Sequence, residues 1–372
     1  MIRYGLFFLL FSLVILLPGI RIAGKKQFQE SPFDLSVTKG LTGYFSLCIL
    51  FHHVAVLYNR YYEIDAVSFA VEQMGVLLVG FFFLFSGYGL IISCETKENY
   101  LKTFVIRRVC TVLLPFFICH YIYILTTLLA GSRYSMKELV LSFFGLILLN
   151  DQMWFAVEIM ILYMAFFLIF RFSKNEKLNF LFMGTFVLGL IIFSFFQGHD
   201  NDSIQMHWFH GEWWYNTTLL FFIGMLLAKH REKLLVTTKK YYGRLLLIFS
   251  VLFLLLWKAT DYMLSNYGYW TETPFDNGYA DKILTLSVQL PMVITFELLL
   301  LLILLKVRIH NRFLTFLGKI SLELVLLQNV FLFLFTDYFP QKTGLYLLTT
   351  TVCTLFLAII INKIKLLILE KK

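Results

Sequence analysis

Long hydrophobic runs recur along almost the entire chain and are separated by short polar segments. A helix needs about 20 predominantly apolar residues to cross a bilayer, and most of these runs approach that length. The pattern therefore predicts an all-α fold, a polytopic bundle of transmembrane helices. We expect eleven spans, at about 4–20, 40–58, 74–93, 109–130, 154–170, 180–196, 214–228, 245–263, 283–305, 314–335 and 344–362.

One further hydrophobic run, at 138–149, is short for a span. The positive-inside rule, by which Lys and Arg concentrate in cytoplasmic loops, decides its topology. If 138–149 does not cross, 24 of the 32 Lys and Arg residues fall on one side of the membrane, and if it crosses this bias collapses. We therefore expect 138–149 to be re-entrant or interfacial and the Lys-rich side to be cytoplasmic. The loops on that side are 21–39, 94–108, 171–179, 229–244, 306–313 and 363–372.

The composition narrows the class of protein further. Charged residues make up 15% of the chain, compared with about 25% in soluble domains. The net charge of +9 lies in the basic loops, so we expect a bilayer and no nucleic acid as the partner, and a multi-pass location in the cell membrane. The five cysteines show neither CxxC nor zinc-type spacing with histidine, so we expect no metal site.

Two adjacent histidines, His52 and His53, lie inside the hydrophobic run of the second span. Ionisable residues are costly in a bilayer and commonly mark a functional site. In a regular helix His53 lies roughly 20 Å from Lys39 and within about 40° of the same face, whereas His52 lies about 140° away. We expect one histidine to be structural and the other functional, and helix geometry favours His53 as the residue that shares a face with Lys39.

A basic pair, Arg107 and Arg108, opens the fourth span, and Pro115 follows. Guanidinium groups suit phosphate binding, but arginines at a helix end also extend to the membrane surface and need no ligand there. The spacing leaves both interpretations open.

Glutamates also lie within the hydrophobic runs. Trp154 and Glu158 begin the fifth span, and Glu158 falls one turn from the outer surface, where contact with water would explain it. Glu323 stands four residues after Lys319, which predicts an i, i+4 ion pair.

Three segments together carry a resemblance to a known family. They are "FDLSVTKGLTGYFSLCILFHHV" at 33–54, "GVLLVGFFFLFSGYGLIIS" at 75–93 and "YLKTFVIRRVCTVLLPFF" at 100–117. In this order they resemble the acyltransferase 3 family of integral membrane O-acyltransferases, and the resemblance covers about residues 31–360. It implies a ten-span acyltransferase domain at 31–366, preceded at 1–30 by an extra transmembrane helix and a basic linker.

The resemblance also implies an activity, the transfer of an acyl group, often acetyl, from a cytoplasmic donor such as acetyl-CoA. The donor would be a co-substrate and no cofactor would be bound permanently. The acceptor would be a hydroxyl of a cell-envelope polysaccharide or glycolipid. An exporter or flippase of a glycan or lipid-linked intermediate is the alternative that the same architecture allows.

The resemblance further implies roles for individual residues. The family histidine would be the general base, and the family pattern points to His52, the first histidine after "LF". His52 and His53 therefore both stay candidates. Lys39, Arg107 and Arg108 would bind the donor, and we expect Ser86, Trp154 and Glu158 to contact substrate. The chain departs from the family pattern in having Lys39 where arginine is common, Thr111 where a second arginine often follows, and Gln328 where many members have histidine.

Overall fold

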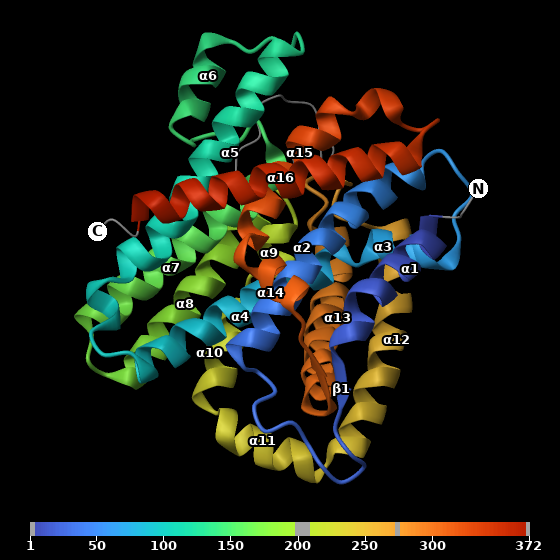
Figure 1. The fold of residues 1–372 in the computed structure, drawn as a ribbon. Helices are drawn as coiled ribbons and strands as arrows, with labels where there is room; N and C mark the ends of the chain where they lie inside the picture. Colours follow the sequence, from blue (N-terminus) through green and yellow to red (C-terminus); the bar gives the residue numbers. More distant parts are fainter. Residues whose placement is uncertain (1–3, 198–208, 272–275, 370–372) are drawn as a thin grey trace.

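The computed structural model describes residues 4–197, 209–271 and 276–369, which form sixteen α-helices and one small sheet (Figure 1). This confirms the all-α fold. The helices are α1 (Tyr4–Leu16), α2 (Leu35–Tyr58), α3 (Ala66–Gln73), α4 (Gly75–Thr96), α5 (Cys110–Leu129), α6 (Met136–Phe143), α7 (Trp154–Phe172), α8 (Glu176–Phe195), α9 (Trp213–Asn216), α10 (Leu219–Lys229), α11 (Arg231–Lys240), α12 (Tyr242–Asn266), α13 (Tyr279–Lys306), α14 (Arg312–Lys319), α15 (Ser321–Leu334) and α16 (Thr343–Leu369). Four 3-10 helices cover Leu17–Gly19 (η1), Tyr100–Lys102 (η2), Asp151–Met153 (η4) and Thr336–Tyr338 (η5), one π-helical turn covers Val105–Val109 (η3), and the strands are β1 (Ile20–Ile22) and β2 (Val307–Ile309).

Within the described residues, eight helices are long and apolar enough to cross a membrane, and a ninth span forms if α14 and α15 are taken together across their 72° bend. The other two predicted spans correspond to shorter helices. Tyr4–Gly19 is a shorter apolar helix, in which α1 is followed by the 3-10 turn that contains Pro18. The run at 214–228 is divided between α9 and α10. The doubtful segment 138–149 contributes only to the eight-residue α6, which is too short to cross.

Helix α2 lies at the centre of the bundle. In its most hydrophobic window 72% of the residues are buried, compared with 6% in the helix pair that contains α12. Asp34 caps its N-terminus by accepting a hydrogen bond from the backbone N–H of Ser36. The Ser36 hydroxyl, which also donates to this carboxylate, is the main cause that lowers the pKa of Asp34. α2 then runs without a bulge to Tyr58, so the side chains along it keep regular helical positions.

Glycines bring two pairs of helices into backbone contact. A Cβ on Gly318 would lie 2.2 Å from the Lys39 carbonyl oxygen, so α14 touches the start of α2. A Cβ on Gly87 would lie 2.0 Å from the Phe221 carbonyl oxygen, so the "FSGYG" segment of α4 touches α10. Small residues allow such close approach between helices in a membrane. These crossings give Gly318 and Gly87 a structural role.

The N-terminal segment is tied to the rest of the chain at both of its ends. Strand β1 pairs antiparallel with β2, with Arg21 opposite Arg308. At the other end, the Tyr4 hydroxyl donates to the Phe51 carbonyl oxygen of α2, and the Tyr44 hydroxyl donates to Ser12 at 2.7 Å. α1 therefore packs against α2 and is not a detached anchor.

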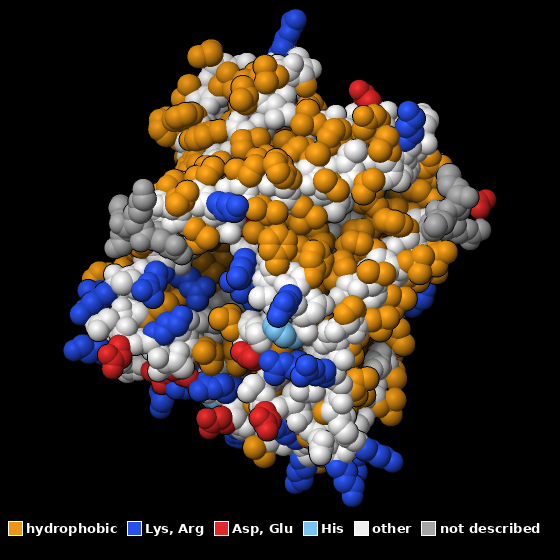
Figure 2. All heavy atoms as spheres, viewed as in Figure 1, with side chains coloured by type: hydrophobic (Ala, Val, Ile, Leu, Met, Phe, Trp, Pro, Cys, Tyr) orange, Lys and Arg blue, Asp and Glu red, His pale blue; other side chains and the backbone are white. Residues whose placement is uncertain are grey.

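Charged and apolar side chains occupy different parts of the surface. In Figure 2, Lys and Arg gather over the lower half of this face, near α11 and β1, while the upper half over α5, α6 and α16 is mostly hydrophobic. The same view shows a hollow at the left with several Lys and Arg side chains around it. The basic loops thus cluster in space, as the positive-inside pattern requires.

Candidate active site

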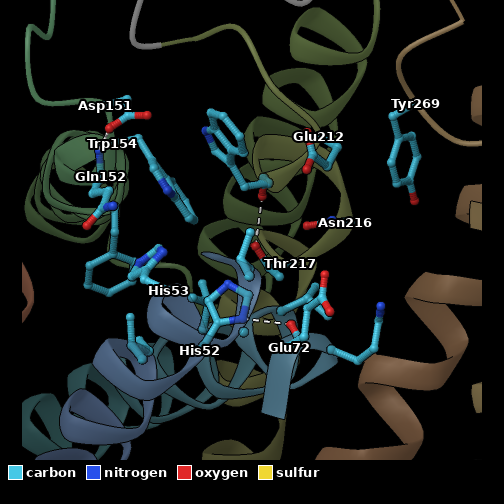
Figure 3. Close-up of a pocket in the computed structure, with 18 of the residues that line it drawn as sticks. His52, His53, Glu72, Asp151, Gln152, Trp154, Glu212, Asn216, Thr217 and Tyr269 are labelled. Carbon is cyan, nitrogen blue, oxygen red and sulfur yellow. Dashed lines mark hydrogen bonds between the residues drawn. The ribbon is translucent and has the colours of Figure 1, made fainter. Parts of the chain in front are cut away.

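One cavity of about 610 Å³ contains both histidines, a size typical of small-molecule sites (Figure 3). Its walls come from the C-terminal half of α2, the junction of α3 and α4, the start of α7, the α9 segment and α13. These are the span ends opposite the Lys-rich loops. The positive-inside rule therefore predicts that the cavity lies toward the outer side of the membrane.

His52 is held by a backbone carbonyl group. Its Nδ1 lies 2.7 Å from the Glu72 carbonyl oxygen (Figure 3). Because a carbonyl only accepts, Nδ1 must carry the proton and donate, which leaves Nε2 of the neutral ring as an acceptor. The helix is interrupted at Met74, so the Glu72 carbonyl lies in the last turn of α3, where carbonyl groups lack a helical N–H partner. The break between α3 and α4 thereby fixes the tautomer of His52.

Two neighbours maintain this arrangement. Gly75, the first residue of α4, lies against the His52 ring, and a Cβ there would come within 2.6 Å of Nε2. Asn59, at the end of α2, donates to the Glu72 carboxylate at 2.6 Å and to the Ser68 carbonyl oxygen at 3.3 Å. Asn59 thus holds α3, which carries the carbonyl group that His52 needs.

His53 also lines the cavity. The two imidazole rings lie 4.9 Å apart between centroids and are inclined by 53°. Within the described part of the chain, no residue hydrogen-bonds to the His53 ring. Both histidines therefore line the cavity, and among the described residues a hydrogen bond orients the ring of His52 but not that of His53.

The three residues expected to contact substrate have different positions. Trp154 lines the cavity and stacks on Trp213, with ring centroids 5.6 Å apart. Glu158 does not line the cavity: it is fully buried and accepts a hydrogen bond from the Thr218 hydroxyl. The expectation that water at the outer surface explains Glu158 is therefore wrong. Ser86 is half-buried on α4 beside the Gly87 crossing and is not among the residues of the cavity wall.

The cavity contains further polar residues that the sequence did not single out. Gln289 of α13 accepts hydrogen bonds from Asn216 at 3.0 Å and from Tyr269 at 2.7 Å. Glu72 and Asp151 add carboxylates to the wall. These residues come from segments far apart in the chain, and no local spacing connects them.

A cluster of cations lies at the opposite, Lys-rich ends of the helices. The charge of Lys39 interacts with those of Lys365, Lys319, Glu323 and Arg108. The glycine contacts between α2 and α14 bring the backbones at Lys39 and Gly318 together, and so place Lys319 beside Lys39. We call Lys39, Arg108, Lys319 and Lys365 the cationic cluster. Sequence reasoning missed Lys319 and Lys365, because their proximity depends on the packing of α14 and α16.

The basic pair that precedes α5 lies in the π-helical turn Val105–Val109, and its two side chains take different directions. Arg108 points inward and donates to the Tyr100 hydroxyl at 2.7 Å and to the Ser93 hydroxyl at 3.3 Å. Arg107 is exposed. Single π-helical turns are frequent at functional sites. Only Arg108 of the pair belongs to the cationic cluster.

The predicted ion pair between Lys319 and Glu323 is wrong. Glu323 is fully buried and pairs with Lys365 of α16. The 72° bend between α14 and α15 removes the regular i, i+4 geometry that the prediction required. Among the described ion pairs, this is the only one in which a member of the cationic cluster takes part, so the cluster keeps an excess of positive charge.

Taken together, the fold and the site define a multi-pass membrane protein with a cavity that contains two histidines and a cationic cluster at the opposite ends of the helices. Within the described residues, no group of three or more His, Cys, Asp or Glu side chains could hold a metal ion. A family model of the acyltransferase 3 family, described as an acyltransferase domain, matches residues 41–363. The chain therefore belongs to this family of membrane acyltransferases. Comparisons with curated proteins and with solved structures gave no match.

Proposed function

We propose that this protein is an O-acyltransferase of the bacterial cytoplasmic membrane that moves an acetyl group from acetyl-CoA to a hydroxyl of a cell-envelope polysaccharide or glycolipid. The observation that carries the proposal is the oriented imidazole of His52 in a cavity on the outer side of the bundle. Family membership supports acyl transfer. The donor, the acyl group and the acceptor are parts of our proposal.

In the reaction, His52 is the general base. Its Nε2 takes the proton of the acceptor hydroxyl while the hydroxyl oxygen attacks the thioester carbonyl carbon. The carbon–sulfur bond then breaks, the acyl group stays on the acceptor oxygen as an ester, and His52 returns the proton to the departing thiolate. A general base of this kind contributes typically about 10²–10⁴-fold to the rate. His53, beside it in the same wall, is the second candidate for the role.

The cationic cluster is suited to the phosphates of a CoA donor. Lys39, Lys319 and Lys365 provide point charges, and Arg108 a guanidinium with hydrogen-bonded orientation. From Lys39 to His52 is 13 residues along α2, or roughly 20 Å at about 1.5 Å per residue. A CoA molecule has its thioester at the end of a long, narrow arm. With its phosphates on the cluster, this arm would extend along α2 toward the histidines. Arg107, which is exposed, would contact the donor only at the entrance.

The proposal is tested with the purified full-length protein and labelled acetyl-CoA. Transfer of the label to envelope glycan in detergent, where no transmembrane gradient exists, would support an acyltransferase. It would also exclude the alternative of an exporter or flippase as a complete account. Mass spectrometry of envelope glycans from a deletion strain then identifies the acyl group and the acceptor. If the purified protein transfers no acyl group from any acyl-CoA, the proposal is wrong.

A further inference from the structure

The outer cavity has a wall composition that discriminates between possible acceptors. Aromatic rings cover much of it: Trp154, Trp213, Trp270, Tyr269, Phe82 and Phe155. Flat apolar rings with a polar edge match the C–H faces and hydroxyl edges of a pyranose ring. An aromatic wall can bind a sugar ring of any charge. Other groups in the wall must therefore determine whether a charged sugar is accepted.

Within the described residues, the buried polar atoms of this wall that lack a hydrogen-bond partner belong to uncharged side chains. Trp213 Nε1, Asn216 Oδ1 and Gln152 Oε1 are buried and have no hydrogen-bond partner within the described residues. Each belongs to a residue that lines the cavity. Buried polar atoms are almost always satisfied in native proteins, so an unsatisfied set calls for a ligand or for water. A sugar hydroxyl can accept a hydrogen bond from the Trp213 N–H and can donate one to the amide oxygen of Asn216 or Gln152.

The charged groups of the wall are mainly carboxylates. Glu72, Asp151 and Glu212 line the cavity, and Arg60 is the one Lys or Arg among its described lining residues. Arg60, after the end of α2, and Asp151, before α7, are both exposed, whereas Glu72 is half-buried. Glu72 and Asp151 alone give the wall two carboxylates, compared with the single guanidinium of Arg60. Within the described residues, the hydrogen-bond partners of Glu72 and Asp151 are neutral. Asn59 donates to Glu72 at 2.6 Å. The backbone N–H of Gln152 donates to Asp151 at 2.8 Å, and the Asn329 amide donates to it at 3.4 Å.

We propose that the sugar ring that enters this cavity is uncharged, and that anionic sugars such as uronic acids are excluded. The inference rests on the proposed function, because it names the class of acceptor for the same site. Carboxylates accept hydrogen bonds from sugar hydroxyls but repel a sugar carboxylate at close range, and like-charge contacts are a standard means of rejecting a wrong ligand. The specificity-determining residues are Glu72 and Asp151.

Binding to the full-length protein in detergent tests the inference without requiring catalysis. The probes are the methyl glycosides of glucose, galactose and mannose together with the matching methyl uronides, and the measurement is saturation-transfer NMR. We expect at least one neutral glycoside to bind at least about tenfold more tightly than its uronide, the difference that a modest electrostatic term produces. The Asp151→Asn and Glu72→Gln variants should narrow this ratio. The Glu63→Gln variant should leave it unchanged, because Glu63 is exposed and does not line the cavity.

The outcomes are distinguishable. A uronide that binds as well as its neutral partner, or no binding of any neutral glycoside, overturns the inference. Faster acetyl transfer to a uronide also overturns it but leaves the acyltransferase in place. Selective binding of neutral glycosides without acyl transfer from any acyl-CoA would instead overturn the proposed function and leave the charge selectivity of the cavity standing.

Discussion

At the scale of single residues, one hydrogen bond distinguishes two adjacent histidines. The Glu72 carbonyl oxygen accepts from Nδ1 of His52, and this assigns the lone pair to Nε2. In hydrolytic triads a carboxylate fulfils the same orienting function. Here a backbone carbonyl group at a helix end does so, without adding a buried charge to a membrane span.

Gly75 should be sensitive to substitution for this reason. Gly75→Ala places a Cβ about where the His52 ring now lies, so the ring must turn away from the Glu72 carbonyl group. We expect kcat to fall by roughly 10–100-fold, because misplaced catalytic groups lose the advantage of orientation. The KM for acyl-CoA should change little. The measurement is steady-state acyl transfer by the purified variant.

Gly89→Ala provides the matched control. Gly89 lies on the same helix, and a Cβ there would meet nothing within 4 Å. This variant should keep full activity. Equal losses in both variants would mean that α4 tolerates no alanine at all, and would contradict the specific role of Gly75.

At the scale of elements, the glycines at the helix crossings have a structural role. A Cβ on Gly224 would lie 1.9 Å from the Leu84 carbonyl oxygen, so Gly224→Ala must push α10 away from α4. We expect a loss of about 1–3 kcal/mol of stability, the usual cost of overpacking. Thermal unfolding of the detergent-solubilised protein measures it as a lower Tm.

Gly189→Ala on α8 is the control for this substitution, because a Cβ there meets open space. Its Tm should stay at or slightly above that of the parent protein, since alanine favours a helix. A Gly224→Ala protein as stable as Gly189→Ala would show that the crossing relaxes without cost.

The same scale shows what the sequence could predict. The lengths of the hydrophobic runs predicted eight helices, because each contains an unbroken apolar stretch long enough to cross a membrane. They are α2, α4, α5, α7, α8, α12, α13 and α16. Run length did not predict the bend that separates Lys319 from Glu323, because the hydrophobic run continues from α14 into α15 and Gly318 alone does not distinguish a bend from a close helix contact. The pairing of Glu323 with Lys365 depends on how α16 packs, and a single sequence carries no such contact.

The candidate site was predictable to a similar degree. His52, His53 and Trp154 were recognisable because polar and aromatic residues in a membrane span are conspicuous. Glu158 was equally conspicuous, but it is buried against Thr218 in the turn between α9 and α10 and does not line the cavity. Gln289 was missed because one amide in a long hydrophobic helix gives little signal until Tyr269 and Asn216 are seen beside it.

At the scale of the whole molecule, the two sides of the bundle differ in charge. Lys239 on α11 belongs to the Lys-rich side, whereas Lys137 on α6 belongs to the cavity side. Single cysteines introduced at these positions into a cysteine-free chain should be labelled from opposite sides in intact cells. We expect a membrane-impermeant thiol reagent to modify Lys137→Cys and not Lys239→Cys. The reverse pattern would invert the topology, and labelling of both would contradict the span assignment.

The position of the cationic cluster also predicts which residues contribute to the affinity for acyl-CoA. Lys319→Ala removes one member of the cationic cluster, and we expect the KM for acyl-CoA to rise about 3–10-fold, with kcat nearly unchanged and weaker dependence on salt. Lys342→Ala, on the cavity side, is the control and should change neither constant. A fall in kcat alone for Lys319→Ala would argue that the cluster acts on the reaction and not on donor binding.

The central claim is that His52, oriented by the α3–α4 junction, is the base. The most direct test compares His52→Ala with His53→Ala in acetyl transfer from acetyl-CoA to envelope glycan, at matched amounts of inserted protein. We predict that His52→Ala loses about 10²–10⁴-fold in kcat/KM, and that His53→Ala retains substantially more activity. Full activity in His52→Ala, or a much larger loss in His53→Ala, would contradict the account.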